Sequence, residues 1–550
     1  MPTISIDKED FLDGLETTLS DDELREELSQ LGTDVESIAD DEIKVEIFPN
    51  RPDLLSSKGL LRNLKGLLGE EEGLPSYTVN KSDYTVSVDS SVKTVRPHTA
   101  CAVVTGLELD DKTLESLIEL QEKIHVTYGR QRSEAALGLY PLESISFPIT
   151  YKALEPNSIS FQPLGWESQA SAADILSDHE KGSEYGSLLS GHDKYPVFTD
   201  DTDNILSMPP IINSEHVGRV TTRTKALFIE CSGFNMRKLE RALNIVCADL
   251  SDQGASIHRV TVETSDQSRP TPTLDETDSH TVRQDSVSDW LGVSMTTETM
   301  LKSLEKMRYN AHIENSDTIN VSNPTYRIDI QGESDIIEDI AIGYGYNRLS
   351  PDQSRTHSNG GKKRFTRYEN KTRETMVGAG FQELYTFSLG NYNTMKELSS
   401  RQPVKMKNSL SKRFNALRSS LIPKHLATIS ENTHYAYPQK LFETGRVFVE
   451  DTSEPTEVLE QTALCATICG SSTGFSDLQQ VFKTVADRIP EGVSFKPGDH
   501  TAMIDGRCSQ IIVDSNPIGI FGEIHPEHLD TLGVNQPVTA GEVILDDIIQ

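Results

Sequence analysis

Cysteine is scarce in this chain: six cysteines occur among 550 residues, and none stands in a CxxC pair or near a histidine cluster at zinc-ligand spacing. The scarcity excludes a disulfide framework and a cysteine-rich zinc domain. Two of the thiols, Cys465 and Cys469, lie in ALCATICG, whose small and β-branched residues predict a buried strand with both side chains on one face. We therefore expect a reduced, cytoplasmic protein.

Long apolar runs and phosphate-binding glycine loops are also missing. No run reaches the roughly 18 apolar residues that span a bilayer, and MPTISIDKEDF carries acids where a signal peptide needs a basic start, so we expect no membrane partner. No GxxxxGK loop is present.

Positive charge is scarce as well. The 52 Lys and Arg residues against 85 Asp and Glu give a formal net charge of -33, which argues against non-specific binding of nucleic acid by the whole surface. Such a surface would suit a cytoplasm of high salt, where charge repulsion is screened.

The length and the 36% hydrophobic content predict three or four domains in a multidomain α+β protein. Residues 1-90 read as an α/β domain: Ser20 and Glu23 form a capping box, Gly32 ends that helix, and the strand IKVEIF leads through a turn to the helix KGLLRNLKGLLG. Residues 91-262 alternate short strands with turns and close on the helix MRKLERALNIVCADLSDQG.

The remaining chain divides at a polar segment. Residues 263-350 give a small domain that ends in an acidic stretch. The segment NRLSPDQSRTHSNGGKKR then predicts a linker, and residues 351-550 predict a large antiparallel sheet with helices on it, with strands at QELYTFSL, QKLFETGRVFVE and TAGEVILDDI among others.

The acidic stretch YRIDIQGESDIIEDIAIGYGYN places many carboxylates where they repel one another. On a helix, Asp335, Glu338 and Asp339 fall within one arc, and Asp329 reaches the same arc after a turn at Gly332. Four oxygen donors without His or Cys would select magnesium or calcium. The alternative is a solvated face, because acids favour the first turn of a helix.

The same stretch resembles the β subunit of archaeal and eukaryotic-type phenylalanyl-tRNA synthetase. IFPNRPDLLS, SMPPIINSEHVGRVT, LFIECSG, GFQELYTFSL, LFETGRVF and FGEIHPEHL resemble further blocks of that family in the same order, so the resemblance covers nearly the whole length. It implies an N-terminal α/β domain, an editing domain that deacylates tRNA, a small domain with a magnesium site shared with the α subunit, and a C-terminal class II synthetase-like domain.

The resemblance also implies which residues bind the metal. The family's carboxylate pattern falls on Asp329, Asp335, Glu338 and Asp339, while Gly332 and Glu333 stand where the family often has His-Pro.

For the editing site, the resemblance implies Ser207, Glu230 and Ser232. Glu230 and Ser232 alternate on one predicted strand and share a face, and Ser207 ends a strand expected beside it. Glu230 would accept the phenol O-H of a mischarged tyrosine, and the serines would position the ester or a water. The alternative is an amphipathic strand with Glu230 in solvent. Phe234 and Asn235 depart from the Thr and Asp common in the family.

A class II active site needs an arginine over ATP late in the sequence. Here no basic residue follows Arg507, so we expect no aminoacylation site in this chain, with ATP and phenylalanine bound by the α subunit. The family implies two α and two β chains and tRNA(Phe) as partners. A free-standing tRNA deacylase and a non-catalytic RNA- or protein-binding relative are the alternatives.

Two further features carry weaker expectations. A basic stretch could contact tRNA phosphate or an acidic face of the α subunit, or form a solvated helix face. It comprises Lys362, Lys363, Arg364, Arg367, Lys371 and Arg373. His216 could touch the tRNA 3' end, or be a turn residue.

Overall fold

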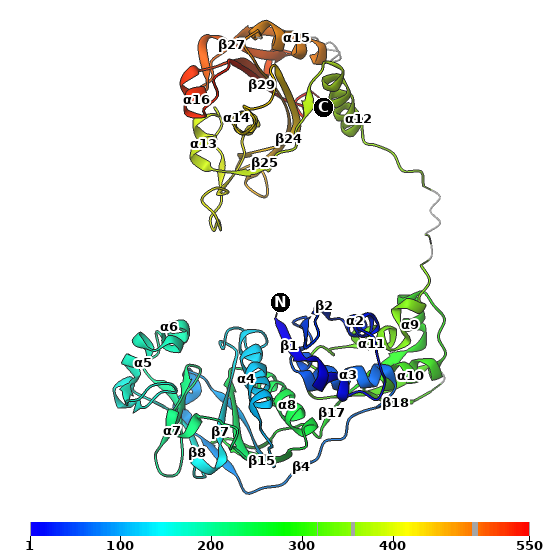
Figure 1. Ribbon diagram of the computed structural model, residues 1–550, viewed down its shortest axis with the longest axis vertical. Helices are drawn as coiled ribbons and strands as arrows, with labels where there is room; N and C mark the ends of the chain where they lie inside the picture. The colour runs from blue at the N-terminus through cyan, green and yellow to red at the C-terminus, as the bar shows by residue number, and fades with distance from the viewer. Residues whose placement is uncertain are drawn as a thin grey trace. The chain divides into compact units, whose positions relative to one another are not determined.

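The computed structural model describes residues 2–315, 317–351, 353, 358–472, 474–486 and 493–548. It divides into two compact units, Met1–Gln353 and Ser354–Gln550 (Figure 1). The linker predicted between them includes residues 352 and 354–357, which lie outside the described residues.

The N-terminal part of the first unit carries a three-stranded sheet in the order β1-β3-β2. Its elements are β1 (Thr3–Asp7), α1 (Lys8–Asp13), α2 (Asp21–Gln30), β2 (Asp34–Ile38), β3 (Glu42–Glu46) and α3 (Ser57–Leu68). The capping box is confirmed, because the Ser20 side chain accepts from Glu23 N while the Glu23 carboxylate accepts from Ser20 N at 2.9 Å. The expected α/β arrangement is wrong for this sheet: both of its strand pairs are antiparallel, and the connection between β2 and β3 is too short for a crossover.

The largest sheet of the first unit has eleven strands, ordered β13-β12-β11-β8-β5-β15-β6-β14-β7, with β4 and β16 also paired to β15. The strands are β4 (Val79–Asn80), β5 (Thr85–Val88), β6 (His98–Thr105), β7 (Ala135–Pro141), β8 (Ile149–Leu154), β11 (Tyr195–Thr199), β12 (Ile205–Met208), β13 (Ile212–Asn213), β14 (Ala226–Gly233), β15 (Ser256–Glu263) and β16 (Ser268–Thr271). The sheet therefore runs from Val79 to Thr271, across the boundaries predicted near residues 90 and 262.

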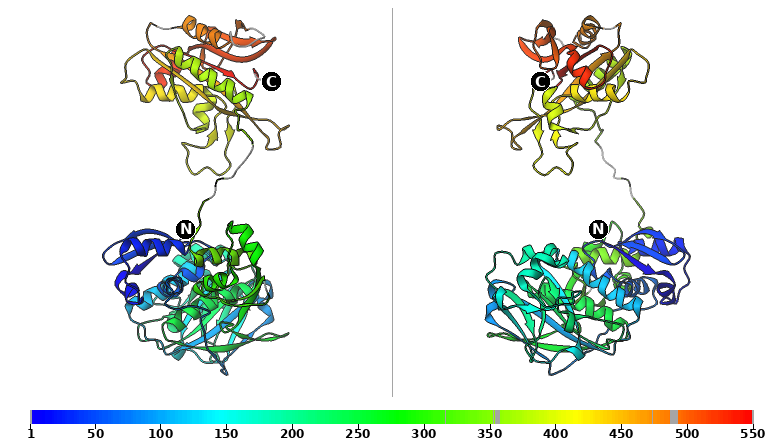
Figure 2. Two further views of the ribbon diagram at one scale, coloured as in Figure 1. Left: turned by 90° about the vertical axis from the view of Figure 1, so that its right-hand side faces the viewer. Right: turned by 60° about the vertical axis from the view of Figure 1, so that its left-hand side comes forward.

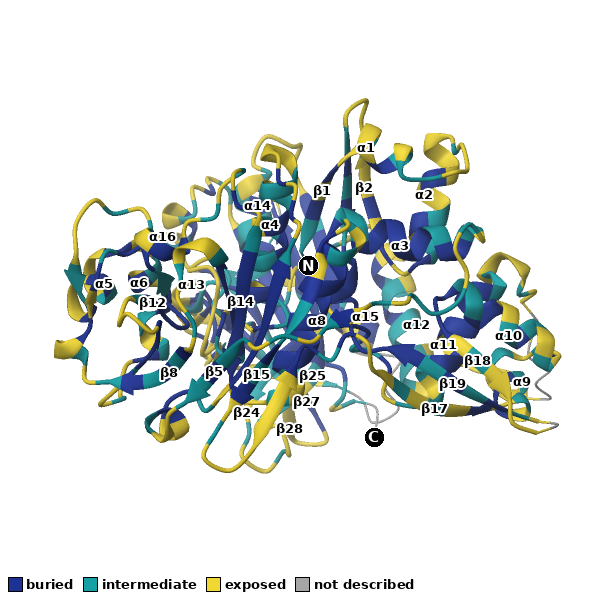
Figure 3. Cartoon of the chain, turned by 90° about the horizontal axis from the view of Figure 1, so that it is seen from below, coloured by how far each residue is buried: buried dark blue, intermediate teal, exposed yellow. Residues whose placement is uncertain are grey.

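Helices cover this sheet, and α4 and α8 lie side by side (Figure 1). The helices are α4 (Asp111–Val126), α5 (Ala172–Asp178), α6 (Glu180–Tyr185), α7 (Glu215–Gly218) and α8 (Met236–Asp252), and β9 (Ser160–Phe161) pairs with β10 (Ala170–Ser171). Strand β14 is buried on both faces (Figure 3). Ile229 and Cys231 join the core that contains Leu243 of α8, whereas Phe228 joins a second core, so Glu230 projects to the face away from α8.

The last part of the first unit holds the acidic stretch. Its antiparallel sheet is ordered β17-β19-β18. The elements are β17 (Thr277–Arg283), α9 (Gln284–Leu291), α10 (Thr297–Lys306), β18 (Asn310–Ile313), β19 (Thr318–Pro324) and α11 (Glu333–Tyr344). The expected acidic helix is confirmed as α11, and its isoleucines at 336, 337 and 340 are buried.

The second unit contains a seven-stranded sheet ordered β20-β24-β25-β29-β28-β27-β26, antiparallel except at β20, with helices packed on it (Figure 2), and a separate antiparallel sheet ordered β21-β23-β22. Its strands are β20 (Gln382–Glu383), β21 (Leu389–Gly390), β22 (Val404–Lys405), β23 (Ala416–Leu417), β24 (Gln439–Glu450), β25 (Val458–Cys469), β26 (Ser494–Pro497), β27 (Met503–Val513), β28 (Asn516–Ile524) and β29 (Val538–Ile544). Its helices are α12 (Arg364–Gly378), α13 (Tyr392–Glu397), α14 (Ile422–Glu431), α15 (Phe475–Ala486) and α16 (Pro526–Thr531).

Two predictions for the second unit have clear outcomes. Cys465 and Cys469 are buried on β25 in one core with Leu426 of α14, as the alternation predicted. The strand predicted over QELYTFSL is interrupted, because the Thr386 hydroxyl and backbone N–H donate to the Glu443 carboxylate in place of a ladder partner.

Candidate functional site

A cavity of about 340 Å³ lies in the first unit beside β7, β12 and β14. Glu230 from β14 and Ser207 from β12 both line it, and their residues are only 2% and 1% exposed. Other lining residues include Gln121, Glu122 and His125 of α4, Arg132, Leu137, Leu139, Lys181, Pro210, Ile211, Asn213 and Arg219. The structure thus brings two of the three predicted editing residues to one buried cavity.

Glu230 is held through only one of its carboxyl oxygens. The Tyr140 hydroxyl lies 3.2 Å from Oε1, while Oε2 is buried without a hydrogen-bond partner in the described structure. Burial raises the pKa of Glu230 to about 8, although the Arg96 guanidinium and the hydroxyls of Tyr140 and Ser232 act in the opposite direction. A buried carboxyl with one free oxygen can receive a hydrogen-bond donor that enters the cavity.

Ser207 is linked to Glu230 through a third side chain, which the sequence did not predict. The expectation that its strand neighbours the strand of Glu230 is wrong: β12 pairs with β11 and β13, and β14 pairs with β6 and β7. The link is Tyr140 of β7, whose hydroxyl donates to Ser207 Oγ at 2.7 Å.

Ser232 does face the same side of β14 as Glu230, but it is not among the residues that line the cavity. Its hydroxyl accepts a hydrogen bond from Arg96 Nε at 3.1 Å, and its carbonyl accepts one from Arg96 Nη2 at 2.5 Å. Arg96 therefore fixes the position of Ser232 outside the cavity lining.

Sequence reasoning missed three residues of this site: Gly138, Tyr140 and Asn213. Gly138 lies opposite Glu230 on β7, and a Cβ there would stand 2.6 Å from Glu230 Oε1 and 2.4 Å from Tyr140 Oη. A usable signal was present in ALGLYP, where the only glycine and the only hydroxyl of an otherwise apolar strand alternate on one face.

His125 also lines the cavity, but both ring nitrogens are engaged. Nδ1 lies 3.2 Å from Glu122 Oε1, and Nε2 accepts from Leu137 N at 2.8 Å. Burial lowers the pKa of this histidine, so it is neutral at physiological pH. It has no free nitrogen to act as a base for Ser207.

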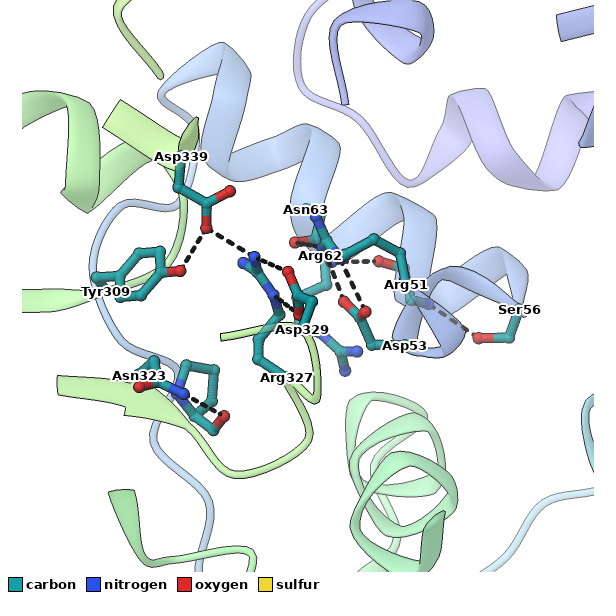
Figure 4. A network of polar contacts seen from close by, with 12 residues as sticks. Arg51, Asp53, Ser56, Arg62, Asn63, Tyr309, Asn323, Arg327, Asp329 and Asp339 are labelled. Atoms are coloured by element: carbon teal, nitrogen blue, oxygen red, sulfur yellow. Dashed lines mark hydrogen bonds and ion pairs between the residues drawn. The ribbon is translucent and has the colours of Figure 1, made fainter. Parts of the chain in front are cut away.

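The acidic stretch contains its own cation (Figure 4). The Arg327 guanidinium donates to both oxygens of Asp329, at 2.9 and 2.6 Å, and to Asp339 Oδ2 at 2.7 Å. Tyr309 also donates to Asp339. A buried arginine therefore lies between two of the four predicted metal ligands.

The other two predicted ligands are arranged differently. Asp335 accepts from the backbone N–H groups of Gln331 and Gly332, at 2.8 and 2.9 Å, at the start of α11. Glu338 is exposed; partial burial and then the carboxylates of Asp339, Asp329 and Asp335 raise its pKa.

The fit of this cluster to magnesium is partial. Hard carboxylate oxygens suit the ion, and the repulsion felt by Glu338 is the kind that a cation relieves. Within the described residues, however, no three acidic, histidine or cysteine groups converge as a metal site requires. This chain by itself does not present a complete site.

The second unit has a polar cavity of about 220 Å³ on its sheet, where Glu542 of β29 meets Ser420 of the segment before α14. Its one arginine, Arg401, donates to Gln461 at 3.3 Å. β29 itself carries no basic residue. The late arginine that an ATP site of this class uses is therefore absent from the strand expected to carry it.

None of the described helices combines the length and the apolar character needed to cross a bilayer.

Three family models match the chain in order. They are the Phe-tRNA synthetase β subunit B1 domain over residues 1–70, the tRNA synthetase B5 domain over 280–346 and the phenylalanyl-tRNA synthetase β chain CLM domain over 353–545. The solved N-terminal fragment of the phenylalanyl-tRNA synthetase β subunit from Pyrococcus horikoshii is 37% identical, with a TM-score of 0.61, and covers 63% of this chain and 100% of the fragment.

Whole-length relatives agree with these matches. The phenylalanine–tRNA ligase β subunit of Archaeoglobus fulgidus is 38% identical over 99% of this chain and 98% of its own length. That of Methanosphaera stadtmanae is 35% identical over 100% of both chains. The protein is therefore a subunit of an aminoacyl-tRNA synthetase, a class of ligases. Within that class, the chain belongs to the family of phenylalanine–tRNA ligase β subunits, and membership implies an α subunit and tRNA as partners.

Proposed function

We propose that this chain supports ATP-dependent attachment of phenylalanine to tRNA(Phe) by an α subunit, and that its large sheet hydrolyses mischarged tyrosyl-tRNA(Phe). The observation that carries the editing role is Glu230, a buried carboxyl that lines a cavity and leaves Oε2 without a partner. Ser207 lines the same cavity.

A second site of this kind has a chemical reason. An apolar phenylalanine pocket excludes tyrosine only weakly, because it meets a near-isostere with one added hydroxyl. A tyrosine side chain in the cavity would donate its phenol proton to Glu230 Oε2. A phenylalanine there would leave that oxygen unpaired, at a cost of about 1–3 kcal/mol, and correctly charged tRNA is spared.

The hydrolytic step needs an oriented water. His125 has no free ring nitrogen, so the cavity offers Ser207 no histidine base, and a covalent enzyme intermediate is disfavoured. Ser207 would position the ester or the water. Ser232 does not line the cavity, so it would contribute indirectly, through its hydrogen bond with Arg96 and its place on β14 beside Glu230.

The test is deacylation of tyrosyl-tRNA(Phe) by the α–β complex with wild-type chain, with Glu230→Gln and with Glu240→Gln. Glu240 is the matched control, because it is a buried carboxylate of the same region paired with Arg269 at 2.6 Å, away from the cavity. We expect about a tenfold or greater loss of deacylation for Glu230→Gln only. Equal rates for wild type and Glu230→Gln would remove Glu230 from the site.

The C-terminal sheet supports catalysis without performing it. Since β29 carries no basic residue, ATP and phenylalanine would bind the α subunit, in an assembly of two α and two β chains. Phenylalanyl-tRNA formation should require both chains, and no adenylate should form on this chain alone. If the α subunit charged tRNA equally well by itself, the free-standing deacylase or RNA-binding alternatives would be favoured.

Magnesium would bind at the exposed edge of the acidic cluster, shared with carboxylates of the α subunit. Of Asp329, Asp335, Glu338 and Asp339, the side chain of Glu338 makes no hydrogen bond or ion pair with the described residues, and partial burial, followed by repulsion from the other three carboxylates, raises its pKa. The ion would supply positive charge at the subunit contact. The test measures how formation of the α–β complex depends on Mg²⁺. If this dependence is lost in Glu338→Gln, the placement is supported, and if it is the same as in the wild type, the placement is contradicted.

The domain division that we propose for this function is 1-90, an editing domain at 91-262, a metal-site domain at 263-350 and a class II-like domain at 351-550, with strands β4, β5 and β16 of the flanking segments completing the sheet of the editing domain. We place the complex in the cytoplasm, where aminoacylated tRNA is used. Limited proteolysis with mass spectrometry tests the boundaries. Because the strands at Val79 and Thr271 both pair with β15, we expect these two strands to resist cleavage.

A further inference from the structure

Tyr140 lies between the two cavity residues that the proposed function uses. It is fully buried, and its hydroxyl lies 2.7 Å from Ser207 Oγ, 3.2 Å from Glu230 Oε1 and 3.4 Å from Asn213 Oδ1. A phenol has one proton to donate and can accept hydrogen bonds on the same oxygen. These three contacts therefore make Tyr140 the centre of a chain in which the direction of each bond depends on the others.

We propose that Tyr140 is a positioning residue that couples Glu230 to Ser207 and keeps Glu230 Oε2 free as an acceptor for the substrate phenol. The proposal rests on the proposed function, in which Glu230 receives that phenol. It adds a residue outside the predicted set and gives the chain Glu230–Tyr140–Ser207 a defined role.

The coupling follows from the proton count. When Glu230 is ionised, Tyr140 donates to Oε1 and accepts from the Ser207 hydroxyl. When Glu230 is protonated, the proton on Oε1 is donated to Tyr140, and Tyr140 donates to Ser207. Oε2 is an acceptor in both states, because Tyr140 holds the exchangeable proton on the Oε1 side. Ionisation of Glu230 and orientation of the Ser207 hydroxyl therefore change together.

Packing holds this geometry in place. The Tyr140 ring lies 5.7 Å from the ring of Phe228 on β14, and Phe147 packs edge-on against Phe228 at 5.5 Å. Gly138 leaves the space that both polar groups need, since a Cβ would stand 2.4 Å from Tyr140 Oη and 2.6 Å from Glu230 Oε1. Only glycine at this position lets the hydroxyl and the carboxyl meet.

Several ionisable groups face Glu230. Arg96 lowers its pKa, and Tyr140 of β7, Cys101 of β6 and Tyr151 of β8 interact with its charge. Across the cavity stand Glu122, His125, Arg132, Lys181 and Arg219. Among these groups Tyr140 is the one whose side chain is hydrogen-bonded to Glu230, so removing its hydroxyl should move the pKa of Glu230 further upward while the other groups stay.

The experiment compares Tyr140→Phe with Tyr151→Phe in the full chain. Tyr151 is the matched control: it is equally buried, stacks on Phe198 at 4.3 Å and donates its hydroxyl to Arg96 O at 2.9 Å instead of to Glu230. The first readout is infrared titration of the Glu230 carboxylic acid, identified by its loss in Glu230→Gln. We expect the midpoint to rise by about half a pH unit or more in Tyr140→Phe, and to rise less in Tyr151→Phe.

Ser207→Ala gives a second, independent arm. If Tyr140 transmits between the ends of the chain, Ser207→Ala shifts the Glu230 titration in the wild-type background and has no effect on it in the Tyr140→Phe background. This double-mutant cycle stays decisive where a single variant is destabilised, because folding is checked by circular dichroism for each of the four proteins. Equal shifts in both backgrounds, or none in either, would overturn the coupling.

The last readout is tyrosyl-tRNA(Phe) deacylation by the α–β complex across pH. We expect kcat/KM to fall about tenfold in Tyr140→Phe, with the pH profile displaced in the same direction as the titration. If the Glu230 titration shifts in Tyr140→Phe but the wild-type complex does not deacylate tyrosyl-tRNA(Phe), the coupling is supported and the editing role is refuted. Active deacylation with an unshifted titration and an unchanged pH profile in Tyr140→Phe refutes the coupling and leaves the editing role standing.

Discussion

Glu230 should cost the protein stability, and the cost should grow with pH. Burial raises its pKa from 4.5 to about 8, so between these values the folded state binds a proton that the unfolded state has released. The free energy of unfolding then falls as pH rises through this interval and is unaffected below it. Glutamine has the same shape without the charge, so Glu230→Gln should remove this dependence.

The magnitude follows from the size of the shift. A displacement from 4.5 to about 8, at about 1.4 kcal/mol per pKa unit, gives an upper bound on the order of 5 kcal/mol above pH 8. The gain in unfolding free energy is smaller by about 1 kcal/mol, because the glutamine amide must find hydrogen-bond partners beside Tyr140. Glu230→Gln should thus equal or slightly trail the wild type near pH 4.5 and exceed it by a few kcal/mol near pH 9.

Tryptophan fluorescence can follow this unfolding in the full chain. The two tryptophans of the sequence, Trp166 and Trp290, both lie in the first unit and report its unfolding by urea. Glu240→Gln serves again as control, because it removes a buried carboxylate paired with Arg269. The reasoning is refuted if the stability difference between Glu230→Gln and wild type stays constant from pH 5 to pH 9.

Three further perturbations have defined outcomes. Arg327→Met should lower the free energy of unfolding of the first unit by about 3–5 kcal/mol in urea titrations, because it leaves Asp329 and Asp339 without their cation; a loss below about 1 kcal/mol would mean that another group neutralises them. Ser20→Ala should cost about 1 kcal/mol in the same assay through loss of the α2 cap shared with Glu23, whereas an unchanged midpoint would assign the cap no role. Raising KCl from 0.1 to 1 M should raise the thermal midpoint, since the net charge of -33 is then screened; a falling midpoint would refute that.

Local elements could be read from the sequence where one chemical signal decides them. The Ser20 capping box, the alternation in β24 and β25, and the isoleucine face of α11 each depend on residues within a few positions of one another. These predictions are confirmed because, in each element, the same residues favour both the local backbone conformation and the face that the fold buries.

Contacts between distant segments could not be read in this way. The meeting of Ser207 with Glu230 depends on Tyr140, 67 residues before the serine, bridging strands that share no ladder. The large sheet likewise extends beyond the predicted boundaries because β4 and β5 pair in parallel with β15, more than 170 residues away. Parallel pairing of remote strands leaves no local pattern at the point where the chain leaves one domain.

The acidic stretch shows how one residue inside the pattern changes its interpretation. Arg327 stands two residues before Asp329 in the sequence, yet its guanidinium also reaches Asp339 on α11, so the two most enclosed carboxylates are neutralised by this chain itself (Figure 4). A second arginine, Arg51, is paired in the same network with Asp53, which joins the N-terminal part of the unit to the acidic helix. Asp53 and Asp339 are buried, and Asp329 is half-buried, beside the buried guanidinium groups of Arg51 and Arg327.

Glu338 is the exposed member of the cluster, and partial burial, followed by the carboxylates behind it, raises its pKa. A surface glutamate in this position gains from any cation that approaches it, because the ion relieves repulsion that the fold has left in place. In the arrangement proposed above, Arg327 neutralises the inner carboxylates within the chain, and Glu338 is left as the exposed carboxylate that a magnesium ion would meet. An ion shared with a second chain is the arrangement that this distribution of charge favours.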